Sequence, residues 1–523
     1  MVKLKPLFVV ACAVALSACQ TAPTTAPQKG VAAGTKGNLD AIKTLVVIYA
    51  ENRGFDHLYG SFPGANGLQN LSAAQTAQRD RDGSVMKELP PVPGEGLTVS
   101  TDPKQITSEA TRGHPNRAYA LDDPNGYGVT LDYKLHDLVH AFYQNQMQIN
   151  GGKNDLFAAY SDVGGEVMGH FDGSKMALWE VAKKYTLADN LFQGTFGGSF
   201  LNHQYLVCAC APFDFKTRAD PETYRNNISD VNDAGTALRL DPQSPKSALD
   251  GPPKFAHYGL LTPDFYAVNT IQPPYQPSGN QPAEKGDLRL ADPEKRNTLS
   301  PQVAMTIGDQ LSAAHIGWAW YSGAWQVALN QGETLNKVAF QYHHQPFNYY
   351  QNFAPGTDAR AEHLRDGGLG GKRFIADIDA GKLPPVTFYK PQGTLNEHAG
   401  YANISAGDAH IAAVIAHLEK SPQWPNMLVV VTYDENGGWW DHVAPPKGDR
   451  WGPGTRVPTI IVSPFARRGY VDHTQYDTGS IQRLINRRFG LAPLPGIEQR
   501  DAALRKNGEK PMGDLTAALE LPK

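Results

Sequence analysis

The chain lacks an excess of basic residues and, after its first residues, any long hydrophobic run. Its 523 residues carry 48 lysines and arginines against 52 acidic residues, and no basic run exceeds short pairs such as Arg467-Arg468. A nucleic-acid binder would usually carry a basic stripe. A membrane-spanning helix needs about 20 consecutive apolar residues. We therefore expect no nucleic-acid partner and no permanent membrane span.

Motifs of several other enzyme classes are also missing. No H-E-x-x-H of a zinc protease occurs. The segment "GGLGGKRF" is not a P-loop, because Asp366 stands at the first glycine position and Arg373 replaces the serine or threonine. Around Ser199, Leu201 replaces the last glycine of the G-x-S-x-G elbow, and the C/S-x-P-x-R setting of sulfatases is absent. No fixed-period repeat suggests a solenoid or propeller.

The N-terminus has the pattern of an export signal. Residues 1–18 contain two lysines and a short apolar stretch, and "LSAC" ending at Cys19 resembles the bacterial lipobox. That resemblance implies cleavage before Cys19, lipidation of its thiol and attachment to a membrane, giving a periplasmic or surface lipoprotein. Residues 19–39, rich in threonine, alanine, proline and glycine, predict a flexible tether. An ordinary secretory signal with a chance cysteine is the alternative, and it also predicts export.

Cysteines are scarce. The sequence holds four, and Cys208 and Cys210 alone remain once the signal is removed and Cys19 is acylated. A bridge across one intervening residue is expected to be strained, and a lone C-x-C is a weak zinc motif. We therefore expect two buried free thiols.

Apolar runs alternate with helical patterns along the rest of the chain. Residues 42–50 and 427–433 are continuously apolar, and "IGWAWY", "PVTFYK" and "RVPTIIVSPF" are further candidate strands. Between them, "AGDAHIAAVIAHLEK" has helical spacing. This alternation predicts an α/β fold with a mostly parallel central sheet and helices on both faces. We expect one catalytic domain over residues 40–523, with the proline- and glycine-rich segment 211–301 as an irregular cap-like insertion; three smaller domains are the alternative.

Acidic pairs follow two of the predicted strands. Glu51-Asn52 end the first, and Asp434-Glu435 end the strand at 427–433. In open α/β sheets, ligands bind at the carboxyl ends of the strands. If the two strands are close, these side chains predict an oxygen-rich cation site. Helix caps and turns are the alternative reading of each pair.

A nucleophile is predicted in "GTFGGSFLNHQYL". Ser199 follows two glycines, which allow close backbone approach, and Asn202 comes one helical turn later. If Ser199 begins a helix, the free amides there face an anion. A plain N-cap is the alternative.

Histidines are the third element. A lone histidine is more often structural, but phosphate chemistry uses several imidazole donors and one group that protonates the leaving oxygen. Candidates in polar or glycine-rich loops are His136, His140, His343, His344 and His398.

Together these segments resemble a known family. "ENRGFDHLYG" is similar to the E-N-R-S-F-D-H motif of the bacterial phosphoesterases, which include acid phosphatases and phospholipases C of the alkaline phosphatase superfamily; Gly54 replaces the usual serine. "GGSFLNHQYL", "YDENGGWWDHVAPP" and "VDHTQYDTGSIQRLI" resemble its later motifs. Phospholipases of the family commonly have threonine at the Ser199 position. With "FNYYQNF", this makes the chain most similar to the respiratory-burst-inhibiting acid phosphatases.

The resemblance implies roles for individual residues. One divalent ion, Ca, Mg, Mn or Zn, would be held by Glu51, Asn52, Ser199, Asp434 and Glu435, with Ser199 also the nucleophile. The phosphate would be lined by His140, Asn202, His343, His344 and His398. Oxygen ligands favour the first three ions over zinc.

The expected function is a metal-dependent acid phosphatase that cleaves phosphomonoesters through a phosphoserine intermediate. Imidazole titrates near ~6.5, which favours activity on the acid side of neutrality. A phospholipase C acting on phosphatidylcholine-type lipids is the alternative, with a lipid headgroup as substrate. A non-catalytic surface binding lipoprotein is a second alternative, and it predicts no turnover.

Overall fold

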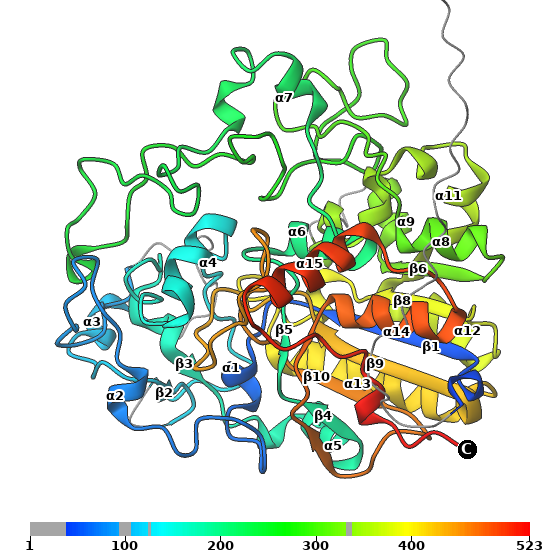
Figure 1. The fold of residues 1–523 in the computed structure, drawn as a ribbon, viewed down its shortest axis with the longest axis horizontal. Coiled ribbons are helices and arrows are strands. Elements are labelled where there is room, and N and C mark those ends of the chain that lie inside the picture. The colour runs from blue at the N-terminus through cyan, green and yellow to red at the C-terminus, as the bar shows by residue number, and fades with distance from the viewer. Residues whose placement is uncertain (1–37, 94–105, 124–126, 331–336, 523) are drawn as a thin grey trace, which may run out of the picture. The chain divides into compact units, whose positions relative to one another are not determined.

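A computed structural model describes residues 38–93, 106–123, 127–330 and 337–522 (Figure 1). The chain divides into two units, residues 1–34 and 35–523, and every described residue belongs to the second. The expected signal peptide, Cys19 and nearly all of the tether lie outside the described residues. Among the described residues, no helix combines the length and apolar character needed to cross a bilayer.

A sheet of eight strands forms the centre of the described unit. Only β10 runs antiparallel to its neighbours within this sheet, so the prediction of a mostly parallel sheet is confirmed. From one edge to the other, the strands are β11 (Tyr470–Asp472), β4 (Thr186–Ala188), β10 (Thr459–Val462), β9 (Met427–Tyr433), β1 (Thr44–Ala50), β8 (Val386–Lys390), β6 (Trp318–Gly323) and β7 (Leu364–Gly368).

Helices cover both faces of the sheet. Tyr389 of β8 is level with Ile48 of β1, and its ring stacks on Phe374 of α12. Tyr49, the next residue of β1, points to the opposite face, where its ring meets His203 of α6. One layer holds α5 (Ala177–Lys184), α12 (Lys372–Asp379) and α13 (Ile404–Lys420), and the other holds α6 (Ser199–Cys208), α8 (Ile307–Ala313) and α14 (Gly479–Phe489).

Shorter elements surround this core. In the described residues, the other α-helices are α1 (Phe55–Tyr59), α2 (Ala73–Thr76), α3 (Ser108–Thr111), α4 (Phe142–Ile149), α7 (Phe215–Ala219), α9 (Trp325–Leu329), α11 (Asp358–His363) and α15 (Pro495–Lys506). Two small parallel pairs are β2 (Tyr119–Ala120) with β3 (Gly169–His170), and β5 (Leu191–Phe192) with β12 (Tyr476–Asp477).

The segment 211–301, drawn in green in Figure 1, adds no strand to the central sheet. It consists of α7, short turns and isolated bridges. Among the contacts that tie it to the core, Arg450 pairs with Asp264 at 2.7 Å, and the amide of Phe142 donates to Asn269 at 3.2 Å. Its role as a cap over the site remains a prediction.

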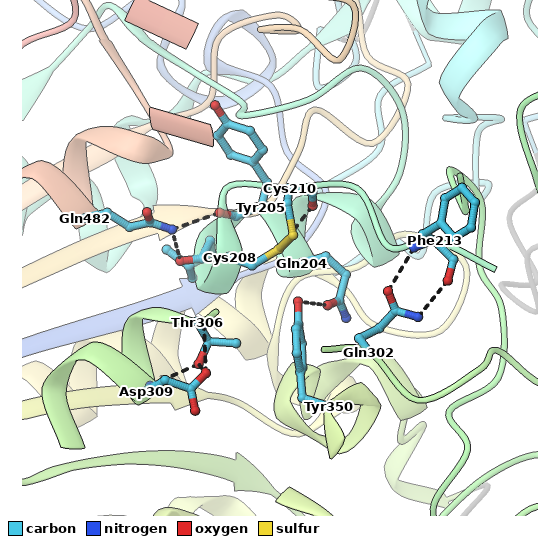
Figure 2. The surroundings of a disulfide bond; sticks show 11 residues. Gln204, Tyr205, Cys208, Cys210, Phe213, Gln302, Thr306, Asp309, Tyr350 and Gln482 are labelled. Atoms are coloured by element: carbon cyan, nitrogen blue, oxygen red, sulfur yellow. Dashed lines mark hydrogen bonds between the residues drawn. A yellow bond between two sulfur atoms is a disulfide. The ribbon is translucent and has the colours of Figure 1, made fainter. Parts of the chain in front are cut away.

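Cys208 and Cys210 form a disulfide (Figure 2). The expectation of two free thiols was therefore wrong. The helix α6 ends at Cys208, and Ala209 adopts a left-handed conformation with φ of 50°. This turn leaves the two Cα atoms 5.1 Å apart, within the range that a disulfide requires.

A buried arginine joins the two loops that follow β1 and β9. Arg456 is fully buried; its Nε donates to Asp441 at 2.9 Å, and its Nη2 donates to Asp56 at 3.0 Å. Asp56 lies in α1, just after the first acidic pair, and Asp441 lies just after the second. One side chain therefore compensates two buried carboxylates and fixes the loops to each other.

Replacing Arg456 by alanine is expected to lower the free energy of unfolding by about 3–5 kcal/mol, because both carboxylates would stay buried without their counter-charge. Urea unfolding measures this change. The control is Arg239→Ala, whose half-exposed side chain pairs with Asp230 and Asp233, and we expect a much smaller loss because solvent screens exposed ion pairs. Similar losses in both variants would contradict the role given to Arg456.

Candidate active site

The sheet brings the two acidic pairs together. Strands β1 and β9 are parallel neighbours, with Ala50 level with Tyr433, so Glu51 and Asp434 leave the sheet side by side. Asp434 Oδ1 accepts from the amides of Asn52 and Glu435 at 3.0 and 2.9 Å. Asn52 has φ of 62°, a left-handed conformation that asparagine tolerates better than most residues. All four predicted side chains are buried at this edge.

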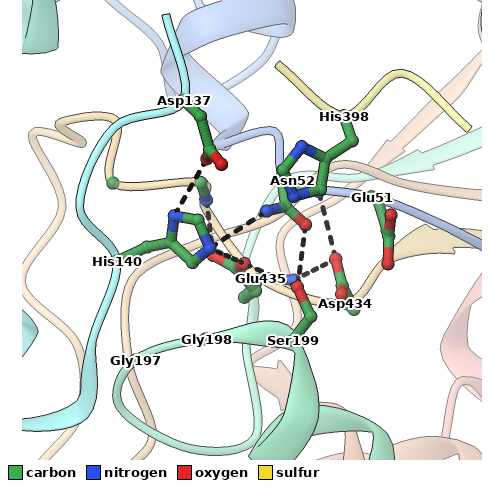
Figure 3. A network of polar contacts seen from close by, with 12 residues as sticks. Glu51, Asn52, Asp137, His140, Gly197, Gly198, Ser199, His398, Asp434 and Glu435 are labelled. Carbon is green, nitrogen blue, oxygen red and sulfur yellow. Dashed lines mark hydrogen bonds and ion pairs between the residues drawn. The ribbon is translucent and has the colours of Figure 1, made fainter. Parts of the chain in front are cut away.

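Ser199 is the first residue of α6 and faces the acids (Figure 3). The preceding turn needs glycine: Gly197 has φ of 79°, and a Cβ there would lie 2.4 Å from the backbone nitrogen of Phe142. Ser199 Oγ lies 3.1 Å from Asn52 Oδ1 and 3.0 Å from Glu435 Oε1. One hydroxyl hydrogen can serve only one of these oxygens. The oxygens of Ser199, Asn52 and Glu435 thus lie close together with too few hydrogens for each to accept or donate a hydrogen bond. Such a group of oxygens favours a bound cation.

Burial disfavours negative charge on the second pair. It raises the pKa of Asp434 to about 7, although Lys390 opposes the shift. It raises the pKa of Glu435 to about 8, against the influence of His140. Asp434 Oδ2 is buried without a hydrogen-bond partner among the described residues. A bound cation would stabilise both carboxylates in their charged form.

Glu51 is instead surrounded by donors. Its Oε1 lies 2.5 Å from His344 Nε2 and 3.1 Å from Lys390 Nζ. Its Oε2 accepts from Asn396, and from the hydroxyl of Tyr401 at 2.9 Å. Burial alone would raise the pKa of Glu51, but His344 and Lys390 hold it well below its usual range. Glu51 is therefore ionised.

Four of the predicted histidines lie around these acids. His140 Nε2 is 3.5 Å from Glu435 Oε1, and its ring centre is 6.0 Å from that of His398. Burial lowers the pKa of His140, but Glu435 and Asp137 raise it to about 9. His343 Nε2 lies 3.8 Å from Glu51 Oε1, next to the His344 contact.

Two predicted residues have other positions. His136 is buried against Glu166, with Nδ1 and Oε2 2.6 Å apart, and makes no contact with the acids. Asn202 supports the nucleophile loop from within: its Nδ2 donates to the carbonyls of Gly197 and Gly198 at 3.0 and 3.2 Å, and its Oδ1 accepts from the amide of Thr195 at 2.9 Å. The structure thus shows loop contacts for Asn202. The phosphate contact expected from the sequence remains a prediction.

Sequence reasoning missed four side chains at the site: His203, Lys390, Asn396 and Tyr401. His203 Nδ1 donates to the carbonyl of Ser199 at 2.8 Å and lies 3.6 Å from Asp434 Oδ2. Its spacing of four from Ser199 on one helix was a usable signal. No sequence signal pointed to Lys390, because a lysine at a strand end is usually exposed.

A serine at a helix start, facing buried carboxylates at the carboxyl ends of a parallel sheet, lies where such sheets bind ligands and can serve as a nucleophile. The Phosphoesterase family model matches residues 42–492, and the protein belongs to this family.

Similar proteins include phospholipases C. Phospholipase C B of Mycobacterium tuberculosis is 23% identical over 525 residues, covering 92% of this chain and 78% of the relative. The non-hemolytic phospholipase C of Pseudomonas aeruginosa is 22% identical over 518 residues, covering 92% of this chain and 58% of the relative. A protein in the alkaline phosphatase superfamily from Vibrio parahaemolyticus aligns in structure with a TM-score of 0.32 and 8% identity, covering 69% of this chain and 67% of that one.

Asn202→Ala should lower kcat by about 10–100-fold with little change in KM, because a shifted nucleophile loses rate while substrate contacts remain. Steady-state kinetics on a phosphoester measure this split. Asn330→Ala, at the exposed end of α9, is the control and should match wild type. A raised KM with unchanged kcat would instead indicate that Asn202 contacts the substrate.

Proposed function

We propose that the protein is a phospholipase C that hydrolyses the bond between glycerol and phosphate in phosphatidylcholine-type lipids. The position of Ser199 Oγ, about 3 Å from both Asn52 and Glu435, supports phosphoester hydrolysis. The choice of lipid rests on the relatives, because the phospholipases C named above match 92% of the chain. This favours the alternative of the sequence analysis over the acid phosphatase expected first.

The chain's own residues support a double displacement. Ser199 Oγ gives its hydrogen to Glu435, 3.0 Å away, and attacks phosphorus. The bond from phosphorus to the glycerol oxygen breaks as a histidine at the site, His140, His343 or His398, protonates that oxygen. The remaining imidazoles donate to the phosphoryl oxygens. Water then attacks the phosphoserine, releases the headgroup phosphate and restores the hydroxyl. Asn202 holds the loop that aims the serine.

A divalent cation fits the acidic cluster. The unpartnered Asp434 Oδ2 and the facing oxygens of Ser199, Asn52 and Glu435 are hard oxygen donors. We assign its ligands to Glu51, Asn52, Ser199, Asp434 and Glu435, with Ca, Mg or Mn preferred over Zn. When bound, such an ion lowers the pKa of a coordinated hydroxyl and offsets charge on the phosphoryl group.

Export in lipidated form is part of the same proposal. The lipobox at Cys19 lies outside the described residues, and it predicts a membrane anchor followed by a catalytic domain over residues 40–523. The disulfide between Cys208 and Cys210 supports an oxidising compartment.

The test of the activity compares phosphatidylcholine vesicles with a chromogenic phosphomonoester. We expect wild type to release diacylglycerol and phosphocholine, and Ser199→Ala to lose at least about 10³-fold in kcat because the hydroxyl that forms the covalent intermediate is removed. Ser174→Ala, at an exposed serine, is the control. Faster turnover of the monoester would favour the acid phosphatase, and no turnover of either substrate would favour a binding lipoprotein.

The test of the metal site uses Glu51→Ala, Asp434→Ala and the double variant. Each single change should lower kcat by several orders of magnitude, and the double variant should be little worse, because both side chains serve one ion. Elemental analysis should find the ion in wild type and not in the variants. Independent, multiplying defects, together with full activity in a preparation verified to be metal-free, would exclude a shared cation.

A further inference from the structure

A cavity of about 760 Å³ lies between α4, the loop 445–453 and the insertion. Apolar side chains form the wall on the side of α4 and the nucleophile loop. They are Phe142, Met147, Ile149, Leu156 and Phe196. Its volume is typical of cavities that bind small ligands.

Charged groups at this cavity come from one loop. Lys447 and Arg450 are exposed, and Arg450 is already paired with Asp264 of the insertion. Asp449 accepts from the buried Arg500 at 2.8 Å. The wall built by α4 and Phe196 therefore offers an organic ligand mainly apolar contact.

Two residues of this wall are close in sequence to the candidate catalytic residues. Phe142 follows His140 by two residues, and Phe196 precedes Ser199 by three. Their rings lie 6.1 Å apart, and Phe142 packs against the turn at Gly197. The loop 445–453 contacts the same two residues. The ring centres of Trp451 and Phe142 are 6.0 Å apart, and the carbonyl of Trp451 accepts from the amide of Phe196 at 2.7 Å.

We propose that this cavity binds the acyl chains of the lipid whose phosphoester the active site cleaves. The proposal rests on the proposed phospholipase C function and adds the position of the apolar leaving group. Burial of methylenes against Met147, Leu156 and Phe196 would hold the diacylglycerol while the phosphate meets Ser199. A small polar monoester would gain nothing from such a wall.

The first experiment varies chain length with monomeric lipids. For wild type, kcat/KM should rise from dibutyryl- to dihexanoylphosphatidylcholine, by about threefold to fourfold for each methylene that enters the cavity. Met147→Trp, which fills the cavity, should lose at least about tenfold in kcat/KM on the dihexanoyl lipid. Met147→Trp should match wild type on p-nitrophenylphosphorylcholine, which has no acyl chain.

The matched control is Met305→Trp, at a methionine that is 59% exposed and does not line the cavity. It should keep the chain-length dependence of wild type. A flat chain-length series in wild type, or equal losses in both tryptophan variants, would overturn the proposal. An equal loss by Met147→Trp on the chain-free ester would also overturn it, because the defect would then not concern acyl chains.

The second experiment separates the cavity from the activity. Calorimetry measures dihexanoylglycerol binding to Ser199→Ala, alone and combined with each tryptophan change. We expect binding that Met147→Trp weakens at least about tenfold and Met305→Trp leaves unchanged. If wild type fails to hydrolyse any lipid but this pattern is found, the proposed function fails and the acyl site stands. Absent or equally weakened binding overturns the acyl site whatever the activity.

Discussion

The parallel pairing of β1 with β9 is the constraint on which the site depends. It places Glu51 beside Asp434 at the ends of two fully buried strands, where carboxylates are costly. The surrounding structure offsets this cost unevenly. Lys390 and His344 keep Glu51 ionised, whereas burial raises the pKa values of Asp434 and Glu435 to about 7 and about 8. The uncompensated part of the cluster lies next to Ser199.

The second layer of contacts holds the loops in place. Arg456 joins the loops after β1 and β9 through Asp56 and Asp441. The carboxylates of Asp56 and Asp441 lie close enough to His442 to bind a metal ion together. The guanidinium of Arg456 already provides the positive charge that balances these two carboxylates. Asn202 holds the loop before Ser199 in a similar way, because its side-chain amide donates to the carbonyls of Gly197 and Gly198. The reacting groups are thus positioned by polar contacts that take no part in the chemistry.

The proposed acyl site concerns substrate specificity. Fold and polar site favour phosphoester cleavage in general, and they do not distinguish a lipid from a small phosphomonoester. The proposed distinction comes from the loops around the site. Here it is an apolar wall from α4 and Phe196, opposite an insertion that contributes no strand to the sheet. A conserved reaction core with variable surrounding loops is how one fold acquires different substrates.

The sequence by itself determined the fold class, and it predicted most of the side chains that the structure brings together at the candidate site. Buried parallel strands are continuous apolar runs, and the acids that follow them, Glu51 and Asp434, stand out because a strand end is a fixed place in such a sheet. The two glycines before Ser199 likewise indicated the candidate nucleophile segment. Three features were decided by tertiary structure alone: the bond between Cys208 and Cys210, the burial of Lys390 against Glu51, and the use of Asn202 as a loop support. Each depends on a local backbone turn or on a distant partner, and neither leaves a periodic or compositional trace in the chain.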